Sequence, residues 1–434
     1  MVTVYAVVAL AAVLIGCSPI RPRSLSGDDR IMVALLFFLT AWPIGMTFFV
    51  GPALLGGVAA APWYPAAWYF PACLLVLWSL ATKIHSGVAR LDISAALLVP
   101  VSVLALLSLI LGPGADIQNL PRWALSAAIL ASVVVKTGRI GLDVIAVGCR
   151  LGLLGTAVAI ALTVLLVPSS VTGCRVDKCG TAGSVLTSEF AGNGNILGIT
   201  VAMLLPFALA RIPWWRGVLV IVGVGVICEL SGSRTAIAAV VVIVLGYALG
   251  RLVRPDRRSA ALLWLLGASV LASLIPAIYN FSAADFSYRA ALWLSARSMI
   301  ATDPVLGRGA TAWETFGASA LFDANYSPHN SWLDITVSVG LVGLLLIVAA
   351  VVSKVVLLAG EEREYLLLFL CGLAAASTLE SLFVPYFLGI VPFTVVLVFM
   401  LDSTRVAVPP SLAPRPRKFT NKVIYSSRIW RLVK

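Results

Sequence analysis

The chain has 434 residues, of which 60% are hydrophobic and 12% are charged, and its mean hydropathy is +1.02. Soluble domains contain roughly 45–50% apolar residues, so this composition excludes an ordinary soluble protein and indicates a membrane protein. Because a helix needs ~20 apolar residues to cross a bilayer, the apolar content suffices for roughly 13 spans and leaves little for a separate soluble catalytic domain. Basic cytoplasmic loops explain the net charge of +12 better than nucleic-acid binding does.

The first apolar run ends in residues 14–17 (LIGC), which resemble a lipoprotein cleavage box. No Lys or Arg precedes this run, although a secretory signal requires a basic segment there. We therefore expect a retained first transmembrane span, with a lipoprotein as the alternative.

Apolar runs between charged or Gly/Pro-rich breaks predict an all-α polytopic membrane protein with about 12–13 transmembrane helices. We divide it into N-terminal helices at 1–184, a second transmembrane domain at 185–401 with a large outer loop at 279–332, and a basic cytoplasmic tail at 402–434. The predicted spans are 2–20, 31–53, 67–82, 93–112, 123–136, 147–167, 195–210, 217–230, 235–250, 260–278, 333–355, 365–383 and 385–401.

The positive charges predict an orientation. With a cytoplasmic C-terminus, alternation of the spans places 24 of the 31 Lys and Arg residues on the cytoplasmic side, as membrane proteins prefer. The tail then lies either on anionic lipid head groups or in solvent. An outer cation needs another reason to be there, and the seven predicted outer cations are Arg122, Arg175, Lys178, Arg234, Arg289, Arg297 and Arg308.

The predicted outer segment at 168–194 contains two closely spaced cysteines, Cys174 and Cys179. An outer face is oxidising, so this pair predicts a small disulfide loop with a structural role. A metal site needs about four ligands, and the neighbouring residues do not supply them.

The longest polar stretch runs from residue 280 to 332 and predicts a functional loop. Within it, Asp285 or Ser287 is expected to cap a helix that ends near Asp303, before a proline. Three residues of this helix are four apart and share one face: Arg289, Trp293 and Arg297.

The two histidines are expected to differ in role. His85 lies in a basic cytoplasmic loop, where a solvated side chain is expected. His329 returns to the outer membrane boundary, and an imidazole can take up or release a proton near neutral pH. A lone histidine is more often structural than catalytic. The outer arginines favour a functional role for His329.

Arg234 lies in a short break between two predicted spans, where a guanidinium is costly unless it is paired or faces water. Guanidinium groups bind phosphate oxygens through two N–H donors. We therefore expect Arg234 and Arg289, with Arg297 and Arg308 as further candidates, to bind the diphosphate of a lipid carrier. The alternative is that each arginine pairs with a carboxylate or a lipid phosphate.

The sequence lacks a Gly-rich phosphate loop, a His-Glu-x-x-His zinc motif, a dinucleotide fingerprint and an Asp-x-Asp pair, so we expect neither a metal nor another cofactor. Glu229 and Glu380 are the acids nearest to span interiors. Proton relay is one role for them, and pairing with the arginines is favoured.

Four motifs together resemble the O-antigen ligase and O-antigen polymerase superfamily of bacterial envelope glycosyltransferases over roughly residues 185–400. The motif at the end of the outer loop is His329-Asn330, then nine residues to Gly340, and then Gly343 after two more. The other motifs are 192–198 (GNGNILG), 233–236 (SRTA), and the 289–293 helix with 303–309 (DPVLGRG).

The resemblance implies a GT-C-like, metal-independent, inverting enzyme that transfers a glycan from a polyprenyl-diphosphate carrier to a glycan or glycolipid acceptor on the outer face of the plasma membrane. Carried over to this chain, Arg234 and Arg289 hold the diphosphate, and His329 is the base for the acceptor hydroxyl or an orienting group. The supporting residues are Asn195, Trp293, Asn330 and Asp334.

One position departs from the family pattern. Many polymerase-like members have Glu two positions before the motif glycine, where this chain has Ser338. Asp334 lies one helical turn earlier and is a candidate substitute.

Two functions from other classes remain as alternatives. A flippase or exporter of lipid-linked glycans should carry charges along a path through its spans, and mid-span charges are scarce here. A surface scaffold for envelope assembly would tolerate point changes at His329.

Overall fold

The computed structural model describes residues 1–18, 26–55, 64–86, 90–111, 120–136, 140–174, 179–181, 183–188, 194–286, 288–309, 311–312, 327–382 and 391–401. Contacts divide the chain into Met1–Ser403 and Thr404–Lys434, and all described residues belong to the first unit. The predicted tail at 402–434 therefore lies outside the described residues.

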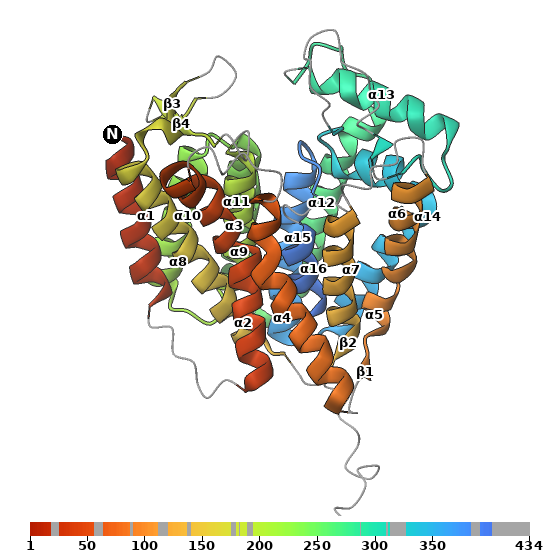
Figure 1. Cartoon of the computed structure of the whole chain (residues 1–434), viewed down its shortest axis with the longest axis horizontal. Coiled ribbons are helices and arrows are strands. Elements are labelled where there is room, and N and C mark those ends of the chain that lie inside the picture. Colours follow the sequence, from red (N-terminus) through yellow and green to blue (C-terminus); the bar gives the residue numbers. More distant parts are fainter. Residues whose placement is uncertain are drawn as a thin grey trace, which may run out of the picture. The chain divides into compact units, whose positions relative to one another are not determined.

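The described residues are mostly helical (Figure 1). Among the described residues before 187 there are ten helices and four strands: α1 (Val2–Cys17), α2 (Gly27–Leu39), α3 (Ala41–Gly45), the π-helix η1 (Met46–Leu55), α4 (Tyr64–Ser86), β1 (Arg90–Leu91), α5 (Ile93–Ala96), α6 (Val99–Leu111), α7 (Leu120–Val134), β2 (Val135–Lys136), α8 (Leu142–Leu166), the 3₁₀ helix η4 (Pro168–Ser170), β3 (Val171–Gly173) and β4 (Ser184–Leu186). The later elements are α9 (Asn195–Ala208), α10 (Trp214–Leu230), α11 (Arg234–Leu252), the 3₁₀ helix η5 (Pro255–Arg257), α12 (Arg258–Ile278), α13 (Arg289–Thr302), α14 (Ser331–Leu357), α15 (Gly360–Ser377) and α16 (Val391–Phe399).

Each predicted span contains a helix, which confirms a multi-pass helical membrane protein. Among the described residues, seven helical segments are long and apolar enough to cross a bilayer, and three shorter helices are also apolar. The total of 12–13 spans stays a prediction. The seven candidate spans are Gly27–Leu54, Ala67–His85, Ile93–Leu111, Leu142–Leu166, Arg234–Leu252, Pro255–Ile278 and Ser331–Leu357.

Helix α9 lies at the centre of the helix packing. It contacts α8, α10, α11 and α15, and its residues from Leu197 to Ala208 are all buried. A helix that is apolar on every side lies either in a protein core or in a membrane, and neighbouring helices cover α9. The outer helices show the opposite pattern, because α12 exposes large apolar side chains such as Trp264 and Leu271, as lipid-facing helices do.

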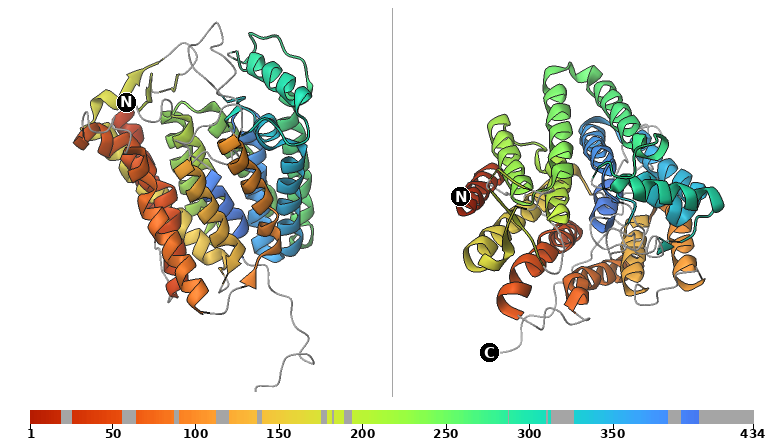
Figure 2. Two further views of the ribbon diagram at one scale, coloured as in Figure 1. Left: turned by 45° about the vertical axis from the view of Figure 1, so that its right-hand side comes forward. Right: turned by 90° about the horizontal axis from the view of Figure 1, so that it is seen from above.

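The two small sheets lie at opposite ends of the helical bundle (Figures 1 and 2). The antiparallel β3–β4 hairpin is at the same end as α13, whereas the β1–β2 pair is at the other end. The α13 end collects the predicted site residues, so we call it the site end.

The β1–β2 end is closed by a buried ionic cluster around Asp92. Its carboxylate Oδ2 lies 2.5 Å from Lys136 Nζ and 2.9 Å from Lys354 Nζ. Both ammonium groups also donate to the Phe399 carbonyl, at 2.6 and 3.2 Å. The cluster thereby ties β2, α14 and the end of α16 to the residue that caps α5.

Candidate functional site

The candidate site is built around Glu380, a buried residue that follows α15. Its Oε1 accepts hydrogen bonds from Arg289 Nη2 at 3.0 Å and from Asn195 Nδ2 at 2.8 Å. Its Oε2 lies 3.0 Å from Nδ1 of His329. Three predicted residues from three separate elements, α9, α13 and the start of α14, are thus joined by one carboxylate, which we call the Glu380 cluster.

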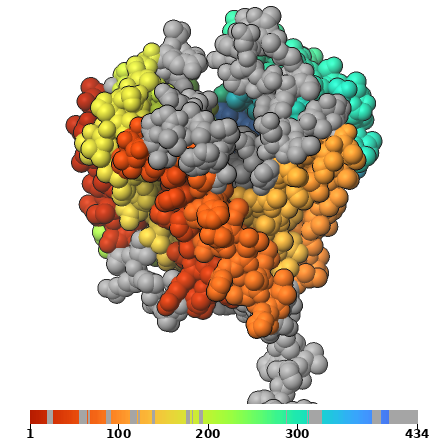
Figure 3. All heavy atoms as spheres, viewed as in Figure 1, coloured from red at the N-terminus to blue at the C-terminus, as the bar shows by residue number. Residues whose placement is uncertain are grey.

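Partial accessibility distinguishes this cluster from a closed structural ion pair. The side chain of Arg289 is 23% exposed and that of His329 is 18% exposed, whereas Glu380 is 10% exposed. In the space-filling view, blue atoms from the C-terminal part of the chain are visible at the site end (Figure 3). The basic members of the cluster are therefore more exposed than the carboxylate that joins them.

The backbone around the basic residues adopts an uncommon conformation. His329 has a φ of 50°, and Tyr288, which precedes Arg289, has a φ of 66°. Residues other than glycine rarely adopt this left-handed backbone conformation, and such backbone strain concentrates at functional sites. The surrounding bonds must therefore hold both residues in place.

Asn330 supplies much of that support for His329. Its Oδ1 accepts from Leu333 N at 3.1 Å and caps α14, a common role for asparagine at this position. Its buried Nδ2 donates to the carbonyl oxygens of Ser273, Ser377 and Thr378, at 3.0 to 3.2 Å. Asn330 therefore fastens the start of α14 to α12 and to the end of α15.

Ser331 fixes the backbone of Glu380 in the same way. Its hydroxyl donates to the Glu380 carbonyl at 2.9 Å and accepts from Leu382 N at 2.9 Å. The adjacent pair Asn330-Ser331 thus positions both partners of the His329–Glu380 contact.

Helix α13 begins at Arg289 and differs at its start from the prediction. Tyr288 is the N-cap residue, and its side chain makes no capping hydrogen bond. The Asp285 carboxylate instead accepts from Ser282 N at 2.9 Å, so the prediction that Asp285 caps this helix is wrong. The alternative cap, Ser287, lies outside the described residues. The helix ends at Thr302, directly before Asp303, as predicted.

Trp293 anchors α13 to the bundle. It is fully buried and packs with Leu333 and Val337 of α14, and its ring centroid lies 5.5 Å from that of Phe281 and 5.3 Å from that of Phe286. The contacts of Trp293 are therefore packing contacts, made one helical turn from Arg289; its supporting role at the site stays a prediction.

The hydrogen bonds and ion pairs described for Arg297 and Arg308 involve residues outside the Glu380 cluster. Arg297 donates to Asn280 Oδ1 at 2.7 Å and to the carbonyl oxygens of Pro276 and Tyr279 at the end of α12. Arg308 pairs with Asp303 at 2.8 Å and is exposed. Among the four arginines, Arg289 is the one with a described bond to Glu380.

Arg234 is the first residue of α11, and it is exposed. The preceding residue, Ser233, caps the helix by accepting from Ala236 N at 3.3 Å. This turn packs closely on the first turns of α9, because a Cβ added to Gly198 would lie 2.8 Å from Ser233 Cβ. Arg234 therefore begins a helix that packs against the one that carries Asn195.

Asp334 is fully buried in the first turn of α14. Ser338 Oγ lies 3.5 Å from its Oδ1, while Oδ2 has no hydrogen-bond partner among the described residues. Ser338, where the family pattern has Glu, and its candidate substitute Asp334 are thus neighbours inside the bundle. The carboxylate that contacts His329 is that of Glu380.

A break in α14 brings together the glycine motif at 303–309 and the one at 340–343. Gly340 has φ 67° and ψ −174°, which interrupts the helix. The segment after α13 enters this break: Leu341 N donates to Pro304 O at 2.9 Å, and Arg308 N donates to Val337 O at 2.7 Å. A Cβ on Gly340 would lie 2.2 Å from Val305 O, so only glycine permits this approach.

Cys174 and Cys179 form a disulfide beside the β3–β4 hairpin. Next to it, Thr181 N donates to the carboxylate of Glu229, and Thr181 Oγ1 lies 3.1 Å from the Tyr5 hydroxyl. Thr181, two residues after Cys179, therefore contacts α10 and α1. The cations between the two cysteines, at 175–178, lie outside the described residues.

Glu380 is the residue that sequence reasoning left out of the candidate site. The available signal was an acid near the end of a predicted span, together with the expectation that such acids pair with the arginines. The described residues contain no group of three or more His, Cys, Asp or Glu side chains suited to a metal ion.

Comparison with known protein families gives a match over part of the chain. Residues 218–348 match the O-antigen ligase family, a segment that contains Arg234, Arg289 and His329 but not Asn195 or Glu380. No curated protein and no solved structure matches the chain. The family implies an enzyme that transfers glycans and uses lipid-linked glycan substrates. The protein is therefore a multi-pass membrane protein that carries an O-antigen ligase family domain.

Proposed function

We propose that this protein transfers a glycan from a polyprenyl-diphosphate carrier to an acceptor hydroxyl at the extracytoplasmic face of the plasma membrane, with inversion at the anomeric carbon. The observation that carries the proposal is the Glu380 cluster, in which one carboxylate joins Arg289, His329 and Asn195. The acceptor is a glycan or a glycolipid.

His329 acts as the base in this proposal. When its Nδ1–H donates to Glu380, the basic lone pair is on Nε2, and the carboxylate stabilises the imidazolium that forms on protonation. The acceptor oxygen bonds to the anomeric carbon, Nε2 takes the hydroxyl proton, and the bond from the anomeric carbon to the diphosphate oxygen breaks.

Arg289 and Arg234 stabilise the departing diphosphate. Arg289 uses Nη2 for Glu380, and its remaining N–H groups are the donors for phosphate oxygens. Arg234 supplies a second cation on an exposed helix start. Fixed positive groups at the position where negative charge develops usually give the largest share of such catalysis.

Two observations support the extracytoplasmic placement. The predicted orientation leaves few cations on the side of the site. The disulfide between Cys174 and Cys179 lies at the same end of the bundle as α13, and disulfides persist in oxidising compartments.

The test is transfer of a lipid-linked glycan by purified protein. We expect His329→Ala and Arg289→Ala each to lower the rate by about 10²–10³-fold, the range observed when a catalytic base or a charge-stabilising donor is removed. Arg308→Ala is the matched control, since Arg308 is exposed and paired with Asp303, and it should transfer at nearly the parent rate. Equal rates for all three variants would show that the site is misplaced.

A strain without the protein separates transfer from transport. Loss of a transferase leaves the lipid-linked glycan on the outer leaflet, whereas loss of a flippase leaves it on the inner leaflet. Accumulation on the inner leaflet would contradict the proposal.

A further inference from the structure

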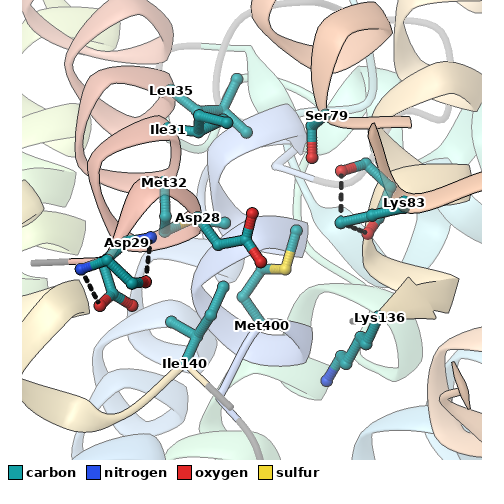
Figure 4. A pocket seen from close by; sticks show the side chains of 12 residues that line it. Asp28, Asp29, Ile31, Met32, Leu35, Ser79, Lys83, Lys136, Ile140 and Met400 are labelled. Carbon is teal, nitrogen blue, oxygen red and sulfur yellow. Dashed lines mark hydrogen bonds between the residues drawn. The ribbon is translucent and has the colours of Figure 1, made fainter. Parts of the chain in front are cut away.

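A polar cavity of about 120 Å³ lies at the β1–β2 end of the bundle, opposite the Glu380 cluster (Figure 4). Its two lysines already bond within the chain. Lys136 pairs with Asp92, and Lys83 donates to the backbone and side-chain oxygens of Ser132, at 2.8 and 3.4 Å. This end of the bundle is therefore held by its own ion pairs and hydrogen bonds.

Glu229, near the end of α10, makes a different kind of contact at the site end. Its carboxylate accepts a hydrogen bond from the backbone N–H of Thr181, two residues after the disulfide-bonded Cys179. A hydrogen bond from an amide to an ionised carboxylate is roughly twice as strong as one between neutral groups. The bond described for Glu229 therefore ties the segment at 179–181 to α10, whereas we expected this acid to pair with an arginine.

The backbone of the segment at 179–181 also lies against the end of α10. A Cβ added to Gly180 would lie 2.9 Å from the carbonyl oxygen of Glu229. That carbonyl accepts from Gly232 N at 3.0 Å, in the turn that leads to Arg234, and Gly232 has a φ of 60°. Glu229 therefore bonds to Thr181 through its side chain and to the turn before Arg234 through its backbone.

The same turn, at residues 229–233, packs against the start of α9. A Cβ on Gly194, the N-cap residue of α9, would lie 2.3 Å from Ser231 O, and one on Gly198 would lie 2.6 Å from Ser231 Oγ. Glycine permits such close approach of two backbones. The turn thus contacts both the segment after the disulfide and the helix that carries Asn195.

These contacts determine how firmly Arg234 is held. Arg234 begins α11 directly after the turn, and it is exposed. If the turn were loose, the guanidinium would have to be ordered when it binds a diphosphate, and the entropy lost would weaken binding. A turn that is already fixed by its neighbours avoids most of this cost.

We propose that Glu229 is a positioning residue, which links the disulfide between Cys174 and Cys179 to Arg234 and thereby strengthens binding of the donor diphosphate. This inference rests on the proposed function, in which Arg234 binds that diphosphate. Donor binding then depends on the oxidised state of the two cysteines. Because disulfides persist in oxidising compartments, the site reaches its full donor affinity only at the oxidising face of the membrane.

Steady-state transfer by the purified, oxidised full-length protein tests the role of Glu229. Glu229→Ala removes the acceptor of the Thr181 bond, and we expect KM for the lipid-linked donor to rise about tenfold, as for the loss of one hydrogen bond to a charged group. KM for the acceptor should not change. Glu229→Gln keeps an acceptor oxygen and should restore most of the donor affinity.

Tyr5→Phe is the matched control for these variants. It removes a hydroxyl that lies 3.1 Å from Thr181 Oγ1 but leaves the amide bond from Thr181 to Glu229. Its KM for the donor should equal that of the parent. A parent KM in Glu229→Ala would overturn the proposal.

Combined variants show whether Glu229 acts through Arg234. In an Arg234→Ala background, Glu229→Ala should not raise the donor KM further, because the effects of coupled residues are not additive. Joint replacement of Cys174 and Cys179 by serine should raise the donor KM of the parent, and Glu229→Ala should add little to that increase. Additive effects in either combination would overturn the proposal.

Hydrogen exchange at the turn separates this proposal from the proposed transfer reaction. Ser233 N donates to Cys228 O and Ala236 N donates to Ser233 Oγ, so loosening of the turn should speed exchange of both amides. We expect faster exchange in Glu229→Ala and in the double serine variant, with parent exchange in the other helices as evidence of folding. Unchanged exchange at the turn would overturn the positioning role even if glycan transfer is confirmed. Faster exchange in a protein that transfers no glycan would support the positioning of Arg234 and overturn the proposed function.

Discussion

A carboxylate gathers basic side chains at each end of the bundle, but the two clusters differ in accessibility. Lys354 and Lys136, which contact Asp92, are buried, and both also donate to one carbonyl of the chain. Arg289 and His329, which contact Glu380, are each about one-fifth exposed. The same pairing chemistry therefore closes one end of the bundle and leaves basic groups accessible at the other.

The clusters also differ in the backbone that carries them. Asp92 caps α5 with ordinary geometry, accepting from Ser94 N at 3.0 Å. At the other end, His329 and Tyr288 have left-handed backbone conformations that neighbouring bonds must maintain. Strain of this kind costs roughly 1–3 kcal/mol per residue and is typical of sites that act on ligands. We therefore expect changes at Glu380 to affect transfer, and changes at Asp92 to affect stability.

The largest expected effect is that of Glu380→Gln. Glutamine keeps the size of the side chain but removes the charge that orients His329 and stabilises its imidazolium, so we expect transfer to fall by about 10³-fold. The rate with a lipid-linked glycan measures this, and Glu380→Asp should restore part of it. If Glu380→Gln has the unfolding temperature of the parent protein and also transfers the glycan at the parent rate, Glu380 has no role in the mechanism.

Asp92→Asn should lower the stability of the protein and leave the transfer rate unchanged, the reverse of the effect expected for Glu380→Gln. It leaves two buried ammonium groups without their carboxylate, and removal of one partner of a buried ion pair costs about 3 kcal/mol. Thermal unfolding of the purified protein should show the loss, while transfer per folded molecule stays near that of the parent. A lower transfer rate in fully folded Asp92→Asn would contradict the expectation that Asp92 affects stability and not transfer.

Gly340→Ala tests the break in α14, which joins this helix to the segment after α13. The added Cβ overlaps Val305 O, and alanine disfavours the positive φ, so we expect a loss of about 2 kcal/mol in unfolding free energy and a lower transfer rate. Gly267→Ala in α12 is a control, since a Cβ there meets no other atom. Equal stability of the two variants would show that the break does not constrain the site end.

The smallest expected effect is a dependence of stability on pH. Burial alone would raise the pKa of Asp92, but Lys136, Ser94 and Lys354 outweigh it and hold this pKa below its ordinary value. A carboxyl with a lowered pKa in the folded state contributes stability above about pH 4, and this contribution is lost as the pH falls further. The difference in unfolding temperature between the parent and Asp92→Asn should be constant from pH 7 to 5 and shrink below pH 4. A constant difference down to pH 3 would contradict this.

The sequence by itself determined the helical multi-pass class and the positions of the helices, and it selected Arg289 and His329 as candidate site residues. These features depend on local composition and spacing, because an apolar run of sufficient length becomes a helix in a membrane wherever it packs. The short motifs around both residues are likewise contained within a few helical turns.

Only the tertiary structure decided which charged groups meet. Glu380 lies 51 residues beyond His329 and 185 beyond Asn195, and the packing of α9, α13, α14 and α15 brings them together. Arg297 shares a helix with Arg289 but bonds to the end of α12 instead. Pairing of charges depends on how helices pack in three dimensions, and hydropathy and spacing along the chain contain no information about that packing.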